Sequence, residues 1–194
     1  MKKLLTIIAT AFIALSVSAQ SEAGSFTLQP NVGFTYASPS FGDGLDGAFG
    51  LTAGVEGMYM INDKFGAALG LNYTGYNTSK EFPTVKGGTE DYIYSNYYFH
   101  IPVTGNYYVA PGLAVKAGIA FNILSTAKFD GDDKVGKDKV KDWYKSTFFS
   151  IPVGVSYEIN DFVFDARYGI GLGNAAEGSD GSFNTLTFTV GYKF

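Results

Sequence analysis

The stretch FSIPVGVSYEINDFVFDARYGIGLG, residues 149–173, decides the fold because apolar residues and small or polar residues alternate along it. Apolar residues occupy every second position in 149–157 and again in 162–172. Asn160-Asp161 separates these two segments, and both residue types favour turns. The stretch therefore predicts two antiparallel strands joined by a two-residue turn.

The same alternation occurs six more times, so the sequence predicts eight strands, at 25–36, 49–61, 65–74, 97–107, 113–123, 149–158, 162–173 and 185–194. Short connections at 62–64, 110–112 and 160–161 alternate with longer ones at 37–47, 78–91, 128–146 and 174–182. Short turns at one end and long loops at the other are typical of bacterial outer-membrane barrels. The predicted fold is an all-β, closed, antiparallel, eight-stranded up-and-down transmembrane β-barrel, with both termini on the periplasmic side.

The polar face of these strands carries few charges. Glycine, serine, threonine, asparagine and alanine fill most of it; the charged residues are Glu56, Lys116, Glu158, Asp165, Arg167 and Lys193. A soluble barrel of the lipocalin type would instead have a charged exterior and an apolar interior. Small side chains suit the inside of a narrow barrel, and the bulky apolar face would aggregate in water. We therefore expect lipid to cover the apolar face.

The N-terminal segment has the pattern of a secretory signal peptide. Met1-Lys2-Lys3 is basic, residues 4–17 are mostly apolar, and Val17-Ser18-Ala19 supplies the small residues of a cleavage site. A membrane anchor helix needs about 20 apolar residues, more than this run provides. We predict a signal peptide at 1–19, cleaved after Ala19, and one barrel domain at 20–194.

Composition narrows the possible functions. Without Lys2 and Lys3, 12 basic and 18 acidic residues remain, a net charge of −6 that argues against nucleic acid as a partner. The chain has no cysteine, which excludes a disulfide framework and a thiol nucleophile. Charged residues make up only 16% of the chain, whereas Phe and Tyr number 17 and 14.

The inward-facing polar residues form the candidate site, a lumen network of Glu56, His100, Lys116, Glu158, Asp165 and Arg167. Buried charges need partners, so these side chains are expected to pair and plug the barrel. The alternative is that they line a narrow polar pore. An eight-stranded barrel leaves room for little more than side chains, which favours the plug.

Catalytic, cofactor and metal sites are not predicted. His100 is the only histidine and a possible general base, but nothing at a recognisable spacing completes a catalytic triad. Asp130-Gly131-Asp132-Asp133 suggests calcium, yet it lacks the other ligands of an EF-hand loop. That loop, with its mixture of Lys and Asp, is interpreted as a solvated extracellular loop.

Pro102 and Pro152 fall inside two predicted strands. Proline cannot donate a ladder hydrogen bond and is usually confined to edges or bulges. Since a closed barrel has no edges, we predict a β-bulge at each proline.

Three stretches, 98–103, 117–128 and 164–172, resemble the outer membrane protein beta-barrel domain or porin-family proteins of Bacteroidota, which are Gram-negative. The resemblance extends over essentially the whole mature chain. The C-terminal residues are similar to the signal that the barrel-assembly machinery recognises; they are Phe188, Val190, Tyr192 and Phe194. The resemblance implies a protein inserted in the outer membrane, surrounded by the lipid bilayer and lipopolysaccharide, and we expect a monomer.

Three functions are compatible with these features. The first is a structural or interaction role through the extracellular loops, with a plugged lumen. The second is a narrow pore or transporter for small solutes or hydrophobic compounds. The third is a membrane enzyme using His100, which has the least support.

Overall fold

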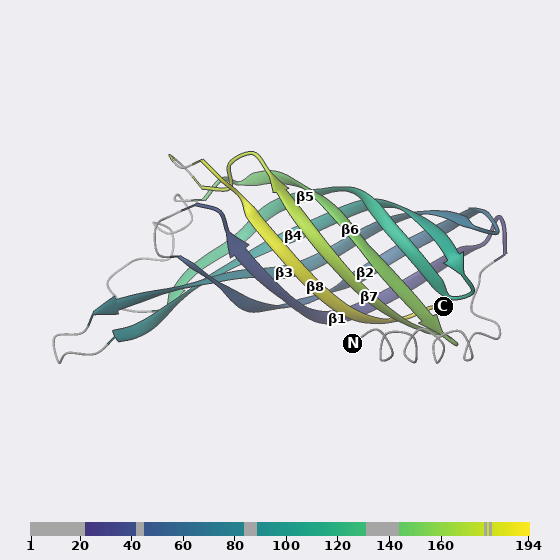
Figure 1. Ribbon diagram of the computed structural model, residues 1–194, viewed down its shortest axis with the longest axis horizontal. Coiled ribbons are helices and arrows are strands. Elements are labelled where there is room, and N and C mark those ends of the chain that lie inside the picture. Colours follow the sequence, from purple (N-terminus) through teal and green to yellow (C-terminus); the bar gives the residue numbers. More distant parts are fainter. Residues whose placement is uncertain (1–21, 42–44, 84–88, 131–143, 177, 179) are drawn as a thin grey trace, which may run out of the picture.

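The computed structural model describes residues 22–41, 45–83, 89–130, 144–176, 178 and 180–194. These residues form eight strands in a closed antiparallel barrel (Figure 1). The strands are β1 (Phe26–Pro39), β2 (Asp46–Asn62), β3 (Phe65–Pro83), β4 (Thr89–Ala110), β5 (Leu113–Asp130), β6 (Thr147–Ile159), β7 (Phe162–Leu172) and β8 (Phe183–Tyr192). The predicted fold class is confirmed. No helix in the described part of the chain is long and apolar enough to cross a membrane.

The barrel closes where β8 pairs with β1, with Val32 opposite Val190. The pairing continues to the last residue, because the backbone N–H of Phe194 donates to the carbonyl of Leu28 at 2.9 Å and the Leu28 N–H donates back at 3.2 Å. Phe194 is therefore part of the barrel wall.

Three tight turns lie at one end of the barrel, together with the C-terminus, and we call this the turn end (Figure 1). Asn62 Oδ1 stabilises the β2–β3 turn by accepting the backbone N–H groups of Lys64 and Phe65, each at 2.9 Å. Gly112 and Asn160 adopt positive φ angles of 72° and 54° in the other two turns. Gly and Asn are the residues that tolerate this conformation best, so these turn predictions are confirmed. The opposite end is the loop end.

The strands at the loop end extend further than the sequence predicts. β3 and β4 remain paired as far as Pro83 opposite Thr89, so most of the predicted loop at 78–91 is a hairpin. β5 follows β4 as far as Asp130. The hairpin of β3 and β4 projects beyond the rest of the barrel (Figure 1). The prediction was wrong here because polar residues follow one another at 77–81, which removes the alternation while backbone pairing continues.

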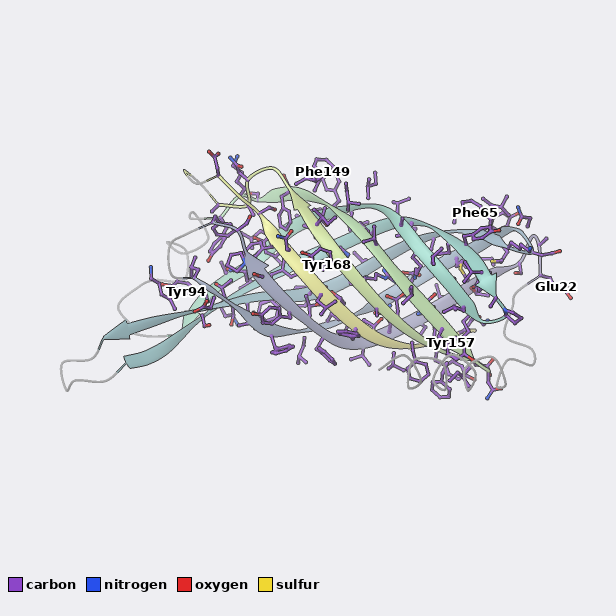
Figure 2. All side chains as sticks on the ribbon, viewed as in Figure 1. Glu22, Phe65, Tyr94, Phe149, Tyr157 and Tyr168 are labelled. Carbon is purple, nitrogen blue, oxygen red and sulfur yellow. The ribbon has the colours of Figure 1, made fainter. Side chains whose placement is uncertain are left out.

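The apolar face points outward, as predicted. Leu51 and Val32 are 75% and 62% exposed, and Phe65 and Phe149 project away from the barrel wall (Figure 2). Phe26 packs over Gly57, and Phe65 packs over Gly105 in the same way. Large aromatic side chains thus cover backbone on the outer surface.

Glycines on the inner face allow neighbouring strands to approach closely. A Cβ atom added to Gly33 would lie 1.9 Å from the carbonyl oxygen of Phe188, and one added to Gly118 would lie 1.9 Å from that of Val103. Any larger residue would force the two strands apart at these points.

The predicted bulges at Pro102 and Pro152 are wrong. Pro102 pairs in register with Ala120 of β5, and Pro152 pairs in register with Gly169 of β7. On the β3 side of Pro102, the ladder has a gap between the pairs Leu69–Val103 and Asn72–His100, yet the register is the same on both sides of it.

Strand geometry explains this accommodation. In an antiparallel sheet the N–H of a residue points toward only one of the two neighbouring strands. A proline therefore leaves its other ladder intact, and it can lie within a closed barrel without an inserted residue. Gly70, across from Pro102, leaves space for the ring, because a Cβ there would lie 2.9 Å from Pro102 Cγ.

Candidate functional site

Four charged side chains meet in the middle of the lumen and form what we call the charge cluster: Glu56 of β2, Lys116 of β5, and Asp165 and Arg167 of β7. Lys116 Nζ lies 2.7 Å from Glu56 Oε1 and 2.9 Å from Asp165 Oδ2. Arg167 Nη2 lies 2.6 Å from Glu56 Oε2, and its Nε lies 2.6 Å from Asp165 Oδ1. Each cation thus contacts both anions.

The charge cluster is electrically balanced and almost fully buried, with side-chain exposures of 1% to 11%. Burying an unpaired charge is very costly, whereas a set whose members are all paired and hydrogen-bonded is tolerated. Gly154 of β6 separates the two cations, since it pairs with Lys116 on one side and Arg167 on the other. A Cβ there would lie 3.0 Å from Arg167 Cγ, so glycine leaves space for the guanidinium side chain.

His100 lies in a separate polar layer nearer the loop end. Its Nδ1 lies 2.7 Å from Asn122 Oδ1 and 3.2 Å from the hydroxyl of Tyr76. The Tyr76 hydroxyl also donates to Asn122 Oδ1 at 3.0 Å, and Asn122 Nδ2 donates to Ser150 Oγ at 3.0 Å. Within the described residues, no carboxylate is among the hydrogen-bond partners of the imidazole.

Glu158 forms a third polar contact, at the turn end. It accepts hydrogen bonds from the hydroxyl of Tyr108 and from Lys193 Nζ, the latter at 2.5 Å. Met58 and Met60 pack beside Tyr108 in an apolar cluster. Glu158 thus links β4 and β6 to the C-terminal segment.

Aromatic side chains fill the lumen at the loop end. We call this group the aromatic cluster; its rings are Phe41, Tyr76, Tyr98, Tyr144, Phe148 and Phe183. Tyr98 contacts Phe148 edge to face with ring centroids 5.3 Å apart, and Phe183 contacts Phe41 at 5.0 Å. Edge-to-face packing of this kind stabilises buried rings.

Backbone segments cover the aromatic cluster. Ser40 N–H donates to the carbonyl of Ser182 at 2.9 Å, and Lys145 N–H donates to that of Ala175 at 2.9 Å. Ala175 and Ala176 are buried against the aromatic cluster. The described residues just after β1, just before β6 and between β7 and β8 thus form one hydrogen-bonded cap over the lumen.

The structure separates the six residues of the predicted lumen network. Glu56, Lys116, Asp165 and Arg167 come together, whereas His100 and Glu158 belong to the two other layers. Sequence reasoning missed the aromatic cluster. Tyr76, Phe148 and Phe183 continue the inward phase of their strands beyond the ends that were predicted, so extending that phase would have found them.

Among the described residues, no group of three or more His, Asp or Glu side chains could hold a metal ion. Residues 131–133 of the possible calcium loop lie outside the described residues. The C-terminal assembly residues Phe188, Val190, Tyr192 and Phe194 all point outward, and their role in assembly stays a prediction.

The family model "Outer membrane protein beta-barrel domain" matches residues 6–194. The chain belongs to this family. The resemblance found in the sequence is thus confirmed, whereas the assignment to Bacteroidota stays a prediction. As a member of the outer membrane protein beta-barrel family, the chain is an integral barrel protein of the bacterial outer membrane. A comparison with curated proteins finds no match.

Several solved structures match this chain over almost their whole length. Neisserial surface protein A is 16% identical with a TM-score of 0.52, and the match covers 89% of this chain and 98% of that one. OprG from Pseudomonas aeruginosa is 16% identical with a TM-score of 0.48, covering 91% and 99%. Ail, the attachment invasion locus protein of Yersinia pestis, is 16% identical with a TM-score of 0.49, covering 89% and 99%. At this identity, the match to Neisserial surface protein A shows the fold alone.

Proposed function

We propose that this protein is a closed outer-membrane barrel with a structural or interaction role, which it performs through the segments at its loop end. The observation that carries the proposal is the filled lumen. The charge cluster lies between the aromatic cluster at the loop end and the contacts of Glu158 with Tyr108 and Lys193 at the turn end.

A narrow pore or transporter is the alternative, and the same geometry argues against it. A passing solute would have to separate the ion pairs of the charge cluster, whose side chains are almost fully buried. Breaking one partner from such a set costs about 3–5 kcal/mol. His100 lacks a carboxylate partner among the described residues, so we also propose that the protein is not an enzyme.

The outward apolar face supports the insertion in lipid that we propose for the barrel. Lipid and lipopolysaccharide surround the wall, the loop end faces the outside of the cell, and both termini lie in the periplasm, as the short turns favour. We further propose a monomer, export by the signal peptide at 1–19, and assembly through the C-terminal residues by the barrel-assembly machinery.

The projecting strands at the loop end support the interaction role. β3 and β4 reach beyond the other strands as a paired hairpin, and β5 pairs with the lower part of this extension (Figure 1). Backbone hydrogen bonds between its strands hold such a hairpin in one conformation. It therefore presents a surface of defined shape to molecules outside the cell. Loops carried by a rigid scaffold are common binding elements.

Solute permeability tests the closed lumen. Liposomes containing the protein would be placed in isotonic solutions of small sugars and amino acids, and swelling would be followed by light scattering. We expect swelling no faster than in protein-free liposomes, while liposomes containing an open porin swell rapidly. Size-dependent swelling with this protein would instead support the transporter.

Two lysines test the orientation, because the chain has no cysteine of its own. Lys128 is exposed at the loop end and Lys64 is exposed in a turn at the turn end. In intact cells, a membrane-impermeant maleimide should label Lys128→Cys and leave Lys64→Cys unlabelled until the outer membrane is permeabilised. Labelling of only Lys64→Cys in intact cells would reverse the proposed orientation.

A further inference from the structure

A small cavity lies inside the barrel between the His100 layer and the charge cluster. Its volume is about 30 Å³. Its lining includes polar groups from both layers and from the closing strands: Asn31, Asn72, His100, Arg167, Thr187 and Thr189. One water molecule needs a cavity of roughly 10–15 Å³ on this scale, so the space suits one or a few water molecules.

Two side chains in the lining have acceptor atoms that need a partner. Asn31 Oδ1 and Asn72 Oδ1 are buried and have no hydrogen-bond partner among the described residues. Asn72 is only 6% exposed. Buried polar atoms without a partner are rare in proteins, and an ordered water usually supplies the missing bond.

Charge decides between water and an ion. A cation in this cavity would lie beside the guanidinium of Arg167, and an anion would lie beside Asp165 and the two amide oxygens. The charge cluster is already neutral as two cations and two anions. A neutral molecule that both donates and accepts hydrogen bonds is therefore the ligand that fits.

We propose that this cavity is an internal hydration site. One or a few water molecules donate to Asn31 Oδ1 and Asn72 Oδ1 and connect the His100 layer to the charge cluster. The His100 layer and the charge cluster are then one continuous polar network rather than two separate ones. The hydration site itself does not require the closed lumen. Only the slow exchange of this water with the solvent outside rests on that proposed function.

Nuclear magnetic resonance of the labelled protein in lipid nanodiscs tests the site. Rotating-frame cross-relaxation between water and side-chain amide protons would be recorded for Asn31, Asn72 and Asn122. Asn122 is the internal control, because it is fully buried, bonded to Ser150 and outside the cavity lining. We expect water cross-peaks at Asn31 and Asn72 and none at Asn122. Absence of both expected peaks would overturn the site.

A matched pair of variants sharpens the assignment. Asn72→Leu removes one acceptor of the cavity, whereas Asn106→Leu replaces a buried asparagine that does not line it. We expect the Asn31 cross-peak to fall at least twofold in the first variant and to stay unchanged in the second. Equal peaks in both variants would contradict the shared water. If Asn72→Leu does not fold, the cross-peaks of the unmodified protein still decide.

A membrane-impermeant gadolinium chelate separates this proposal from the closed lumen. Cross-peaks that persist with the chelate present support both the hydration site and the closed lumen. Cross-peaks that the chelate broadens support the hydration site but show that the lumen is open. Missing cross-peaks overturn the hydration site and leave the closed lumen as it stands.

Discussion

The charge cluster and the aromatic cluster fill neighbouring parts of one lumen by different physical means. In the charge cluster each cation contacts both anions at 2.6 to 2.9 Å, so all four members depend on one another. In the aromatic cluster the rings touch at centroid distances of 5.0 to 6.4 Å, mostly without specific polar contacts. Losing one ring leaves the others packed, whereas losing one charge leaves its partners unbalanced.

This difference teaches how a narrow barrel is filled. Ion pairs specify which strands face each other, because a misplaced charge is strongly penalised. Aromatic rings fill volume and adjust to their neighbours, which suits the end where irregular segments cover the lumen. The clusters should therefore respond differently to substitution.

Removing one charge should have the largest effect. Lys116→Met leaves Glu56 and Asp165 with only Arg167 between them, and we expect a loss of about 3–5 kcal/mol in the free energy of unfolding. Urea unfolding in lipid vesicles, followed by the shift between folded and unfolded bands on unboiled gels, measures it. Lys64→Met, at the exposed turn, is the control.

Restoring neutrality should recover part of this loss. When Glu56→Gln accompanies Lys116→Met, the bidentate pair between Asp165 and Arg167 remains. The double variant should unfold at a higher urea concentration than Lys116→Met alone. If Lys116→Met were as stable as the Lys64→Met control, the stability of the barrel would not depend on mutual pairing within the charge cluster.

Removing one ring should cost somewhat less. Phe183 is 1% exposed within the aromatic cluster, and Phe183→Ala should lower stability by about 3 kcal/mol, toward the small end for such changes because the cap segments can settle into the space. Phe188→Ala on the outward face of the same strand is the control, since lipid chains can occupy the vacated volume. Equal losses in the two variants would mean that Phe183 does not act as a core residue.

The hydroxyl of Tyr76 marks the border between the aromatic cluster and the His100 layer. It contacts Asn122 and His100 while its ring belongs to the aromatic cluster. Tyr76→Phe should cost about 1 kcal/mol, the usual value of a buried hydrogen bond. The same urea experiment measures it, and no change would place Tyr76 wholly within the aromatic cluster.

The hydroxyl of Tyr98 should matter least. It is buried and has no hydrogen-bond partner among the described residues. Tyr98→Phe should change stability by no more than about 0.5 kcal/mol, because it removes a group that makes no bond. A loss as large as that of Tyr76→Phe would reveal a polar contact in a cluster that we describe as apolar.

The barrel wall was predictable from sequence, but its filling only in part. Strict alternation specified the strands and their inward faces, so Glu56, Lys116, Asp165 and Arg167 could be placed in the lumen. Nothing in the sequence showed that Glu158 would bond to Lys193 rather than join the charge cluster. The position of a side chain along the barrel axis depends on strand tilt and register, which alternation does not reveal.

The loop end was predicted least well. Outside the expected lipid belt both strand faces are polar, so residues 78–81 carried no period-two signal although they belong to β3. The predicted β-bulges at Pro102 and Pro152 were wrong for another reason. The rule assumes that a proline disrupts the hydrogen bonds of its strand to both neighbouring strands, whereas the hydrogen bond is lost on one side only.

Single-channel recording tests the central claim, that side chains close the lumen, most directly. The purified protein would be inserted into a planar lipid bilayer in molar salt, and current would be recorded across a range of voltages. The filled lumen predicts a baseline without stable unitary steps at every voltage that the bilayer withstands. Stable unitary currents that appear with insertion of the folded protein would contradict it.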